Sequence, residues 1–197
     1  MALRIAAACC LLVLAGCGGD GGGGSEAKGA VPDWPAPPNA MELTRGGGLT
    51  PESAEFLEYH VHAHLDVLFN GDRVTVPAGI GIDTTNPAVE SDDRGVGLTR
   101  ECDTPCISPL HTHATDGVLH TETKTPAPNN LGQFFVQWDV KLDASCVGEF
   151  CAPGTPIGFY VDGDAYDGDP REIELSDGRE IAVAIGTPPD EIPSEFP

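Results

Sequence analysis

The clearest pattern along the chain is an alternation of apolar and polar residues over 59–69. Apolar side chains occupy its odd positions from residue 61 onward. The even positions carry His60, His62, His64 and Asp66, with Leu68 as the exception. A period of two is typical of a β-strand that buries one face. We therefore expect a half-buried strand with a row of three histidines on its polar face.

Asn70-Gly71 follows this strand directly and is a strong signal for a two-residue turn. A hairpin closed by this turn pairs Val67 with Val74. That register places the apolar residues of both strands on one face, which supports the pairing.

Residues 109–122 predict a second hairpin, with Asp116-Gly117 as a two-residue turn. This turn sets two facing pairs, His113 with His120 and His111 with Glu122. All four side chains then lie on one face, with opposed residues about 4.5–5.5 Å apart. Imidazoles at that separation can converge on one metal ion with bonds of about 2.0–2.1 Å.

Helix signals are few. Thr50-Pro51 resembles a helix start and predicts a short helix to about residue 57. Residues 129–142 fit two interpretations. Their apolar positions alternate as in a strand, but Asn130 with Gln133 resembles a capping box at the start of a helix.

The C-terminal third predicts three strands, over 156–162, 171–175 and 179–185, with a turn over 176–178 between the last two. Short strands separated by turn signals, with little helix, indicate an all-β fold. We expect a β-sandwich or a small open barrel with one or two short helices.

The first sixteen residues resemble a signal peptide, because Arg4 precedes an apolar run from Ile5 to Leu14. The run is shorter than the roughly 20 residues of a transmembrane helix. Leu14-Ala15-Gly16-Cys17 resembles a bacterial lipobox, in which Cys17 is lipidated; the alternative is an ordinary secretory signal with a chance cysteine. We expect a lipid-anchored protein in the cell envelope, on the outer face of the membrane.

Composition divides the rest of the chain into three parts. Residues 17–49 are rich in Gly and Pro and predict a mostly disordered tether, in which Trp34 is either incidental or a docking point onto the domain. Residues 50–188 form the predicted histidine-rich β domain, and residues 189–197 form a C-terminal tail.

Four cysteines remain in the domain after the signal peptide and Cys17 are set aside: Cys102, Cys106, Cys146 and Cys151. Outside the cytoplasm, an even count predicts two disulfides. Local pairs (102–106 and 146–151) and crossed pairs are both compatible with the sequence. A thiolate metal ligand is the alternative.

The charge is strongly acidic, with 31 Asp and Glu against 10 Lys and Arg and a formal net charge of -21. Nucleic acid and anionic lipid headgroups repel such a surface, so we expect no nucleic-acid partner and membrane contact only through the lipid anchor. Cations are suitable partners. The sequence identifies no partner protein.

All six histidines fall in two short segments, and we interpret them as metal ligands. The candidate ligands are His60, His62, His64, His111, His113, His120 and Glu122. We expect the two clusters to face each other or to lie side by side on one sheet, in one mononuclear site or two close sites. Imidazole affinity peaks at Cu(II), so copper is favoured, with zinc close behind.

The predicted function is sequestration or delivery of this ion. The alternative is a metal-dependent enzyme, an oxidoreductase or hydrolase, with one coordination position open. A third interpretation is a structural domain in which the metal only links strands. The histidine rows could also be a solvated strand face or a pH-sensitive switch.

Four motifs resemble those of a family of secreted bacterial and archaeal lipoprotein domains with HxHxHL and LHTHxxxGxxHxE signatures. They are YHVHAHLDVLFNG (59–71), VPAGIGI (76–82), LHTHATDGVLHTE (110–122) and LGQFF (131–135). The resemblance covers roughly residues 55–187 and implies that the histidines are the family's signature, without implying a reaction. Its members often carry a single Cys before LHTH, whereas this chain has Cys102 and Cys106.

Overall fold

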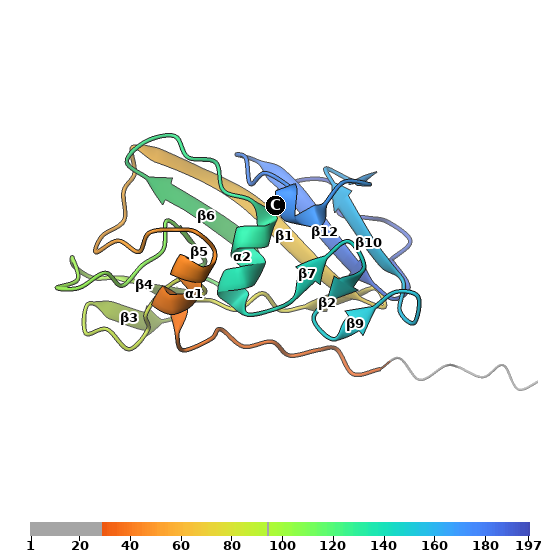
Figure 1. The fold of residues 1–197 in the computed structure, drawn as a ribbon, viewed down its shortest axis with the longest axis horizontal. Helices are drawn as coiled ribbons and strands as arrows, with labels where there is room; N and C mark the ends of the chain where they lie inside the picture. The colour runs from red at the N-terminus through yellow and green to blue at the C-terminus, as the bar shows by residue number, and fades with distance from the viewer. Residues whose placement is uncertain (1–28, 94) are drawn as a thin grey trace, which may run out of the picture.

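The computed structural model describes residues 29–93 and 95–197 (Figure 1). The predicted signal peptide, the lipidation site Cys17 and residues 17–28 of the predicted tether lie outside this part. Within the described ranges, no helix is both long enough and apolar enough to cross a bilayer.

A seven-stranded sheet forms the centre of the fold, in the order β11-β10-β12-β1-β6-β5, with β2 also paired to β1. The central strand β1 runs parallel to β12 on one side and antiparallel to β6 and β2 on the other. The strands are β1 Tyr59–Phe69, β2 Asp72–Val74, β5 Leu110–His111, β6 Val118–Thr123, β10 Ile157–Val161, β11 Asp164–Ala165 and β12 Arg179–Ile185.

The other elements are small. Two further sheets are a hairpin of β3 Val89–Asp92 with β4 Gly95–Leu98, and a three-stranded sheet of β7 Leu142–Asp143, β8 Cys146–Val147 and β9 Phe150–Cys151. The helices are α1 Ala40–Gly46, α2 Leu131–Trp138 and the 3-10 helix η1 Pro170–Glu172. Across the described residues the strands close no barrel. The predicted all-β class with one or two short α-helices is confirmed.

Helix α2 resolves the ambiguity over 129–142 in favour of the helix. The Asn130 side chain accepts a hydrogen bond from the Gln133 backbone N–H, and the Gln133 side chain accepts one from the Asn130 backbone N–H. This reciprocal capping satisfies two N–H groups at the helix start. The helix then buries Phe134, Phe135 and Trp138 in the main hydrophobic core, together with the odd-numbered residues of β1 from 63 to 69.

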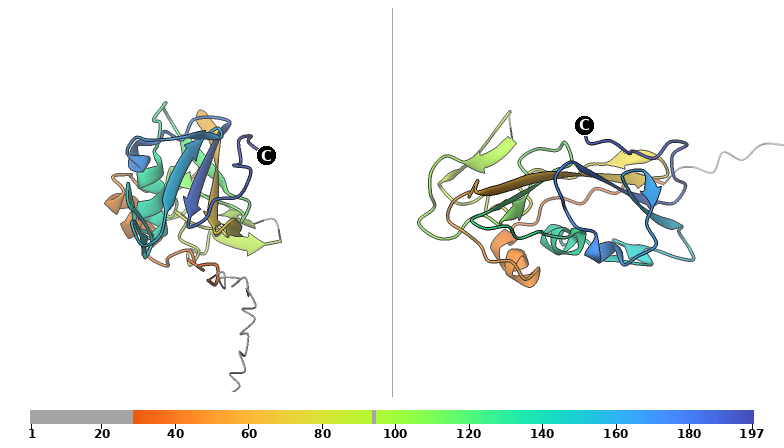
Figure 2. Two further views of the ribbon diagram at one scale, coloured as in Figure 1. Left: turned by 90° about the vertical axis from the view of Figure 1, so that its right-hand side faces the viewer. Right: turned by 90° about the horizontal axis from the view of Figure 1, so that it is seen from above.

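The two faces of the main sheet are covered differently. Helix α2 lies on one side, and the C-terminal segment crosses the other side (Figure 2). That segment packs Pro189 against Gly71 and Ser194 against Gly163, and it brings the Phe196 ring 6.1 Å from the His64 ring.

This cover changes the expected burial of β1. Its seven residues 63–69 are all buried, and its first four are only partly buried or exposed. The prediction of a half-buried strand is therefore wrong for the second half, because the C-terminal segment shields a face that the alternation alone suggested was solvated.

Two predicted elements are wrong. Residues 50–57 form no helix; the chain there is irregular, and Glu52 makes a β-bridge to Ile107. Residues 171–175 form no strand, because Pro170 follows the capping residue Asp169 and the chain turns into η1. The strands predicted over 59–69, 156–162 and 179–185 are confirmed, as is the first hairpin with Val67 opposite Val74.

The tether predicted over 17–49 is wrong for its second half. Residues 40–46 form α1, which contacts α2 and buries Ala40 and Thr44. Trp34 packs edge-on against Trp138 at 5.7 Å between ring centroids and accepts a hydrogen bond from the Trp138 indole N–H at its carbonyl oxygen. Of the two interpretations of Trp34, the docking point is correct.

Both cysteine pairs are local. Cys102 is bonded to Cys106, and Cys146 is bonded to Cys151 across the β8–β9 pair. The crossed pairing is excluded, and none of the four serves as a thiolate ligand.

Candidate metal centre

The pairing of strands brings the two histidine segments together on one face of the main sheet. β1 and β6 place His62 opposite His120 and His60 opposite Glu122. β5 and β6 place His111 opposite His120. The prediction that the clusters lie side by side on one sheet is confirmed.

The register predicted for the second hairpin is wrong by two residues. His120 pairs with His111 and not with His113, because residues 112–117 form a longer connection in place of a two-residue turn. His113 leaves the sheet and bonds to β4, where its carbonyl accepts from the Val96 N–H at 2.8 Å. A shift of two residues keeps side chains on their face, so the histidines still converge.

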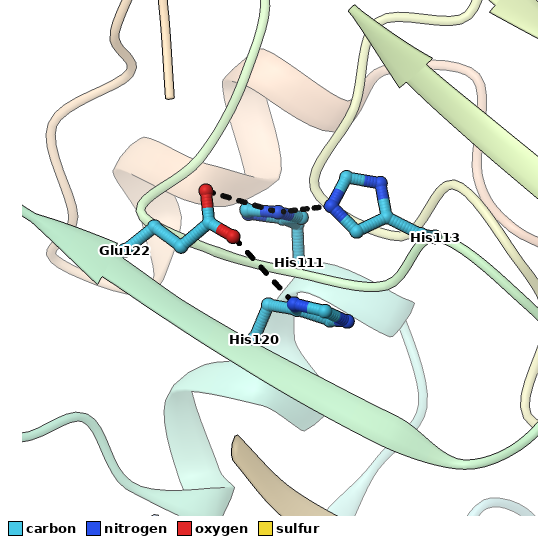
Figure 3. A group of neighbouring side chains, drawn as sticks. All are labelled: His111, His113, His120 and Glu122. Atoms are coloured by element: carbon cyan, nitrogen blue, oxygen red, sulfur yellow. Dashed lines mark hydrogen bonds and ion pairs between the residues drawn. The ribbon is translucent and has the colours of Figure 1, made fainter. Parts of the chain in front are cut away.

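The first of three clusters on this face is the imidazole centre, which consists of His111, His113, His120 and Glu122. One potential ligand atom of each lies within 4.8 Å of those of the others (Figure 3). His111 and Glu122 are buried, and His113 and His120 are half-buried. The centre thus has a buried side and a side close to solvent.

Backbone carbonyls fix the orientation of two of these rings. Nδ1 of His111 lies 2.9 Å from the Ser108 carbonyl oxygen, and Nδ1 of His113 lies 2.6 Å from the Val96 carbonyl oxygen. A carbonyl can only accept, so each Nδ1 carries the hydrogen and each Nε2 is left with a lone pair in the neutral ring. The two Nε2 atoms face each other at 3.0 Å (Figure 3). Two lone pairs at this distance repel unless a proton or a metal ion bridges the two nitrogens.

Burial keeps His111 neutral. Its pKa falls from 6.5 to about 3, first because the ring is removed from water and second because His113 would repel a second positive charge. A neutral imidazole with a free Nε2 is the form that binds a metal ion.

Glu122 supplies negative charge to the same centre. Its oxygens lie 3.1 Å from His60 Nε2, 3.5 Å from His120 Nδ1 and 3.9 Å from His111 Nε2. Burial alone would raise the pKa of Glu122, but the hydrogen bond to His120 and the neighbouring imidazoles lower it overall. Its Oε2 is buried with no hydrogen-bond partner, which leaves that atom free to bind a cation.

The second cluster, the outer histidine group, consists of His60, His62 and His120. Nε2 of His62 lies 3.1 Å from Nδ1 of His120, and His60 is exposed. The pKa of His62 is lowered, mainly because the ring is buried and to a lesser extent because of the charges of His120 and His60. Because His120 belongs to both clusters, the outer group connects the imidazole centre with solvent.

His64 belongs to neither of these clusters. Its ring nitrogens lie 2.7 Å from Glu180 Oε2 and 2.8 Å from the Asp116 carbonyl oxygen. Six of the seven predicted ligands are therefore brought together, and His64 is placed with different partners.

Sequence reasoning missed Glu55. Burial and the charge of Glu122 raise the pKa of its carboxyl, which His113 and His120 partly offset. The side chain therefore lies within electrostatic reach of the imidazole centre. Glu55 stands in a segment for which the sequence suggested a helix, and no periodic pattern marks it.

The donors of the imidazole centre suit a borderline transition-metal ion. Three imidazoles and one carboxylate are ligands that Zn(II), Cu(II) and Fe(II) accept, whereas Mg(II) and Ca(II) prefer oxygen alone. Comparison with protein-family models, curated proteins and solved structures gave no match for this chain.

Proposed function

We propose that the chain binds one Cu(II) or Zn(II) ion at His111, His113, His120 and Glu122. The observation that carries the proposal is the facing pair of Nε2 atoms, 3.0 Å apart, on rings whose Nδ1 atoms are committed to backbone carbonyls. With metal–nitrogen bonds of about 2.0–2.1 Å, neighbouring nitrogens of a tetrahedral site lie about 3.3 Å apart. A small relaxation of the two rings accommodates an ion.

Copper is the favoured ion. Among divalent first-row metals, affinity for a nitrogen-rich site is highest for Cu(II), and Zn(II) lies below it. The carbonyls of Ser108 and Val96 hold His111 and His113 from behind, in the manner of the hydrogen bonds that orient metal-binding imidazoles in other proteins.

The proposed role is sequestration or delivery at the cell envelope, with the domain anchored through Cys17. The outer histidine group, in which His60 is exposed, shares the half-buried His120 with the imidazole centre, which provides a stepwise route for the ion. The net charge of -21 raises the local concentration of cations around this route.

The test is metal analysis of the mature chain, purified without a histidine tag and dialysed after incubation with Cu(II) or Zn(II). We expect at least one retained ion per chain, and loss of that ion in His111→Ala and His113→Ala. Glu58→Gln is the control, because it changes an exposed residue just before β1 and leaves the four ligands and the outer histidine group in place. Retention of less than about one ion by the wild-type chain overturns the proposal.

A metal-dependent enzyme is the second candidate, and two observations favour it. A pocket of about 300 Å³ lies beside Glu122, lined also by Phe56 and Pro109. The Glu55 carboxyl, with its raised pKa, provides an acid near the centre.

Azide binding separates the two candidates. An open coordination position binds azide and gives a new charge-transfer band in the Cu(II) form, whereas a carrier site with all positions filled gives none. A third outcome, unfolding on chelation, indicates a metal that only links strands.

A further inference from the structure

A third cluster lies on the same sheet face, further along β1. This carboxylate centre consists of His64, Asp66 and Glu180, which are 2%, 3% and 1% exposed. The parallel pairing of β1 with β12 sets His64 directly beside Glu180, and Asp66 follows two residues along the same face. One potential ligand atom of each lies within 4.8 Å of those of the other two.

Two carboxylate oxygens in this cluster have no hydrogen-bond partner. They are Asp66 Oδ2 and Glu180 Oε1, and both are fully buried. The second oxygen of each carboxylate does have a partner. Asp66 Oδ1 accepts from the Arg73 guanidinium, and Glu180 Oε2 contacts His64. A buried carboxylate oxygen without a partner is strongly disfavoured unless a cation or a proton satisfies it.

The loop that contains Asp116 and Gly117 fixes the orientation of the His64 ring. Nε2 lies 2.8 Å from the Asp116 carbonyl oxygen, so it carries a hydrogen and Nδ1 faces Glu180. The next residue, Gly117, has φ +84°, and a Cβ there would lie 2.7 Å from His64 Nε2. Only glycine allows the loop to approach this closely in that backbone conformation.

We propose that the carboxylate centre is a second cation site, selective for a harder divalent ion than the imidazole centre. Its donors are Asp66 Oδ2, Glu180 Oε1 and, after its hydrogen is released, His64 Nδ1. A set of two carboxylates and one imidazole suits Mn(II) or Fe(II), whereas the imidazole centre suits Cu(II) or Zn(II). Arg73 remains on Asp66 Oδ1 and balances part of the negative charge.

A small pocket gives the ion access. It has a volume of about 80 Å³ and is lined by Asp66, Arg73, Asp116 and Gly117, among others. The Arg73 side chain is 67% exposed and lies at the edge of this pocket, where it stays paired with Asp66 Oδ1. The C-terminal segment also reaches the cluster, where the Phe196 ring packs edge-on near the His64 ring. The centre is therefore buried but reachable.

The experiment uses Mn(II) as the probe and electron paramagnetic resonance of the free ion as the readout. We expect the wild-type chain to bind one Mn(II), and Asp66→Asn and Glu180→Gln, which preserve side-chain size, to lose at least tenfold in affinity. Glu58→Gln, at an exposed acid just before β1, is the matched control and retains the wild-type affinity. Unchanged circular dichroism spectra of the two variants show that they are folded.

Two results overturn the inference. If the wild-type chain binds no Mn(II), the cluster is a network of ion pairs only. If His111→Ala abolishes Mn(II) binding while Asp66→Asn and Glu180→Gln retain it, the ion belongs to the imidazole centre. Failure of Cu(II) and Zn(II) binding, by contrast, affects only the function proposed for that centre.

Discussion

The imidazole centre and the carboxylate centre lie on the same face of one sheet, yet they present different chemistry. The first half of β1 is paired with β6, which contributes His120 and Glu122. The second half is paired with β12, which contributes Glu180. The first centre has two half-buried histidines, whereas the second is buried throughout because the C-terminal segment covers it. The alternation of residues in β1 therefore determines only the face of the sheet on which a side chain lies. The paired strand and the C-terminal segment determine which groups surround it.

The pKa values of His111 and His64, one from each centre, are shifted in opposite directions. His111 lies among imidazoles, and its pKa is lowered. Burial would also lower the pKa of His64, but the hydrogen bond and charge of Glu180 raise it overall. The pKa of Glu180 is itself raised by burial. Neighbouring charged and hydrogen-bonding groups, more than the depth of burial, thus decide whether the pKa of a buried imidazole is raised or lowered.

The largest expected effect is on the stability of the carboxylate centre. Glu180→Ala leaves His64 buried without its charged partner and should lower the free energy of unfolding by about 3–5 kcal/mol. Urea denaturation of the metal-free chain measures it. Glu172→Ala, at an exposed acid in η1, should stay within about 0.5 kcal/mol of wild type. Equal losses in both variants would contradict the assigned role of Glu180.

The next effect concerns the imidazole centre. His111→Ala should lower Cu(II) affinity by about 100-fold or more, since loss of a ligand exceeds the 10–100-fold effect of losing an orienting hydrogen bond. His64→Ala should change Cu(II) affinity by less than about threefold. Competition with a chromophoric chelator measures both. If the two variants weaken binding equally, the centres are not independent.

A further effect, distributed over several pH units, is the response of the metal-free chain to acid. The unfolded chain protonates His111 near pH 6.5, but the folded chain does so only at about pH 3. Between these values the unfolded state binds the extra proton, so stability falls as pH falls, by up to about 1.4 kcal/mol per pH unit. His64, with a raised pKa, acts in the opposite sense: its contribution is present below pH 6.5 and is lost as pH rises through the folded value.

Urea midpoints at several pH values separate these contributions. His111→Ala should flatten the decline between pH 6.5 and 3. His64→Ala should remove the part of stability that disappears toward higher pH. An unchanged acid profile in His111→Ala would show that its neutral state is not maintained by burial.

The smallest expected effect concerns the C-terminal segment that lies over the carboxylate centre. Phe196→Ala removes the ring that packs near His64 in this centre and should speed Mn(II) release several-fold, with Cu(II) release unchanged. Stopped-flow mixing with a chelator measures both rates. Faster release of both ions would indicate a general loosening of the fold instead of a local opening.

The sequence predicted the parts of this arrangement that depend on local pattern. The period of two located β1, Asn70-Gly71 located the first turn, and the grouping of histidines located the imidazole centre. Asp116-Gly117 suggested a tight turn, but the bonds between His113 and Val96 on β4 take His113 out of the hairpin.

Other features depend on distant parts of the chain. His64 looked equivalent to His60 and His62, and only the pairing with β12 separates it from them. After Arg179 at the start of β12, Glu180 is followed only by apolar residues, and its position beside such a run is the one signal that could have indicated a buried partner. The cover by the C-terminal segment has no local signal at all.

The parallel pairing of β1 with β12 has a consequence for the order of folding. His64 and Glu180 are 116 residues apart, whereas His111 and Glu122 lie within one hairpin. Closing a long loop costs more chain entropy than closing a short one, and contacts between distant segments form more slowly. As the chain folds, the residues of the imidazole centre can therefore assemble early, and those of the carboxylate centre only after the strand at 179–185 has paired with β1. The identity of the ions present at each moment can decide which centre is filled first.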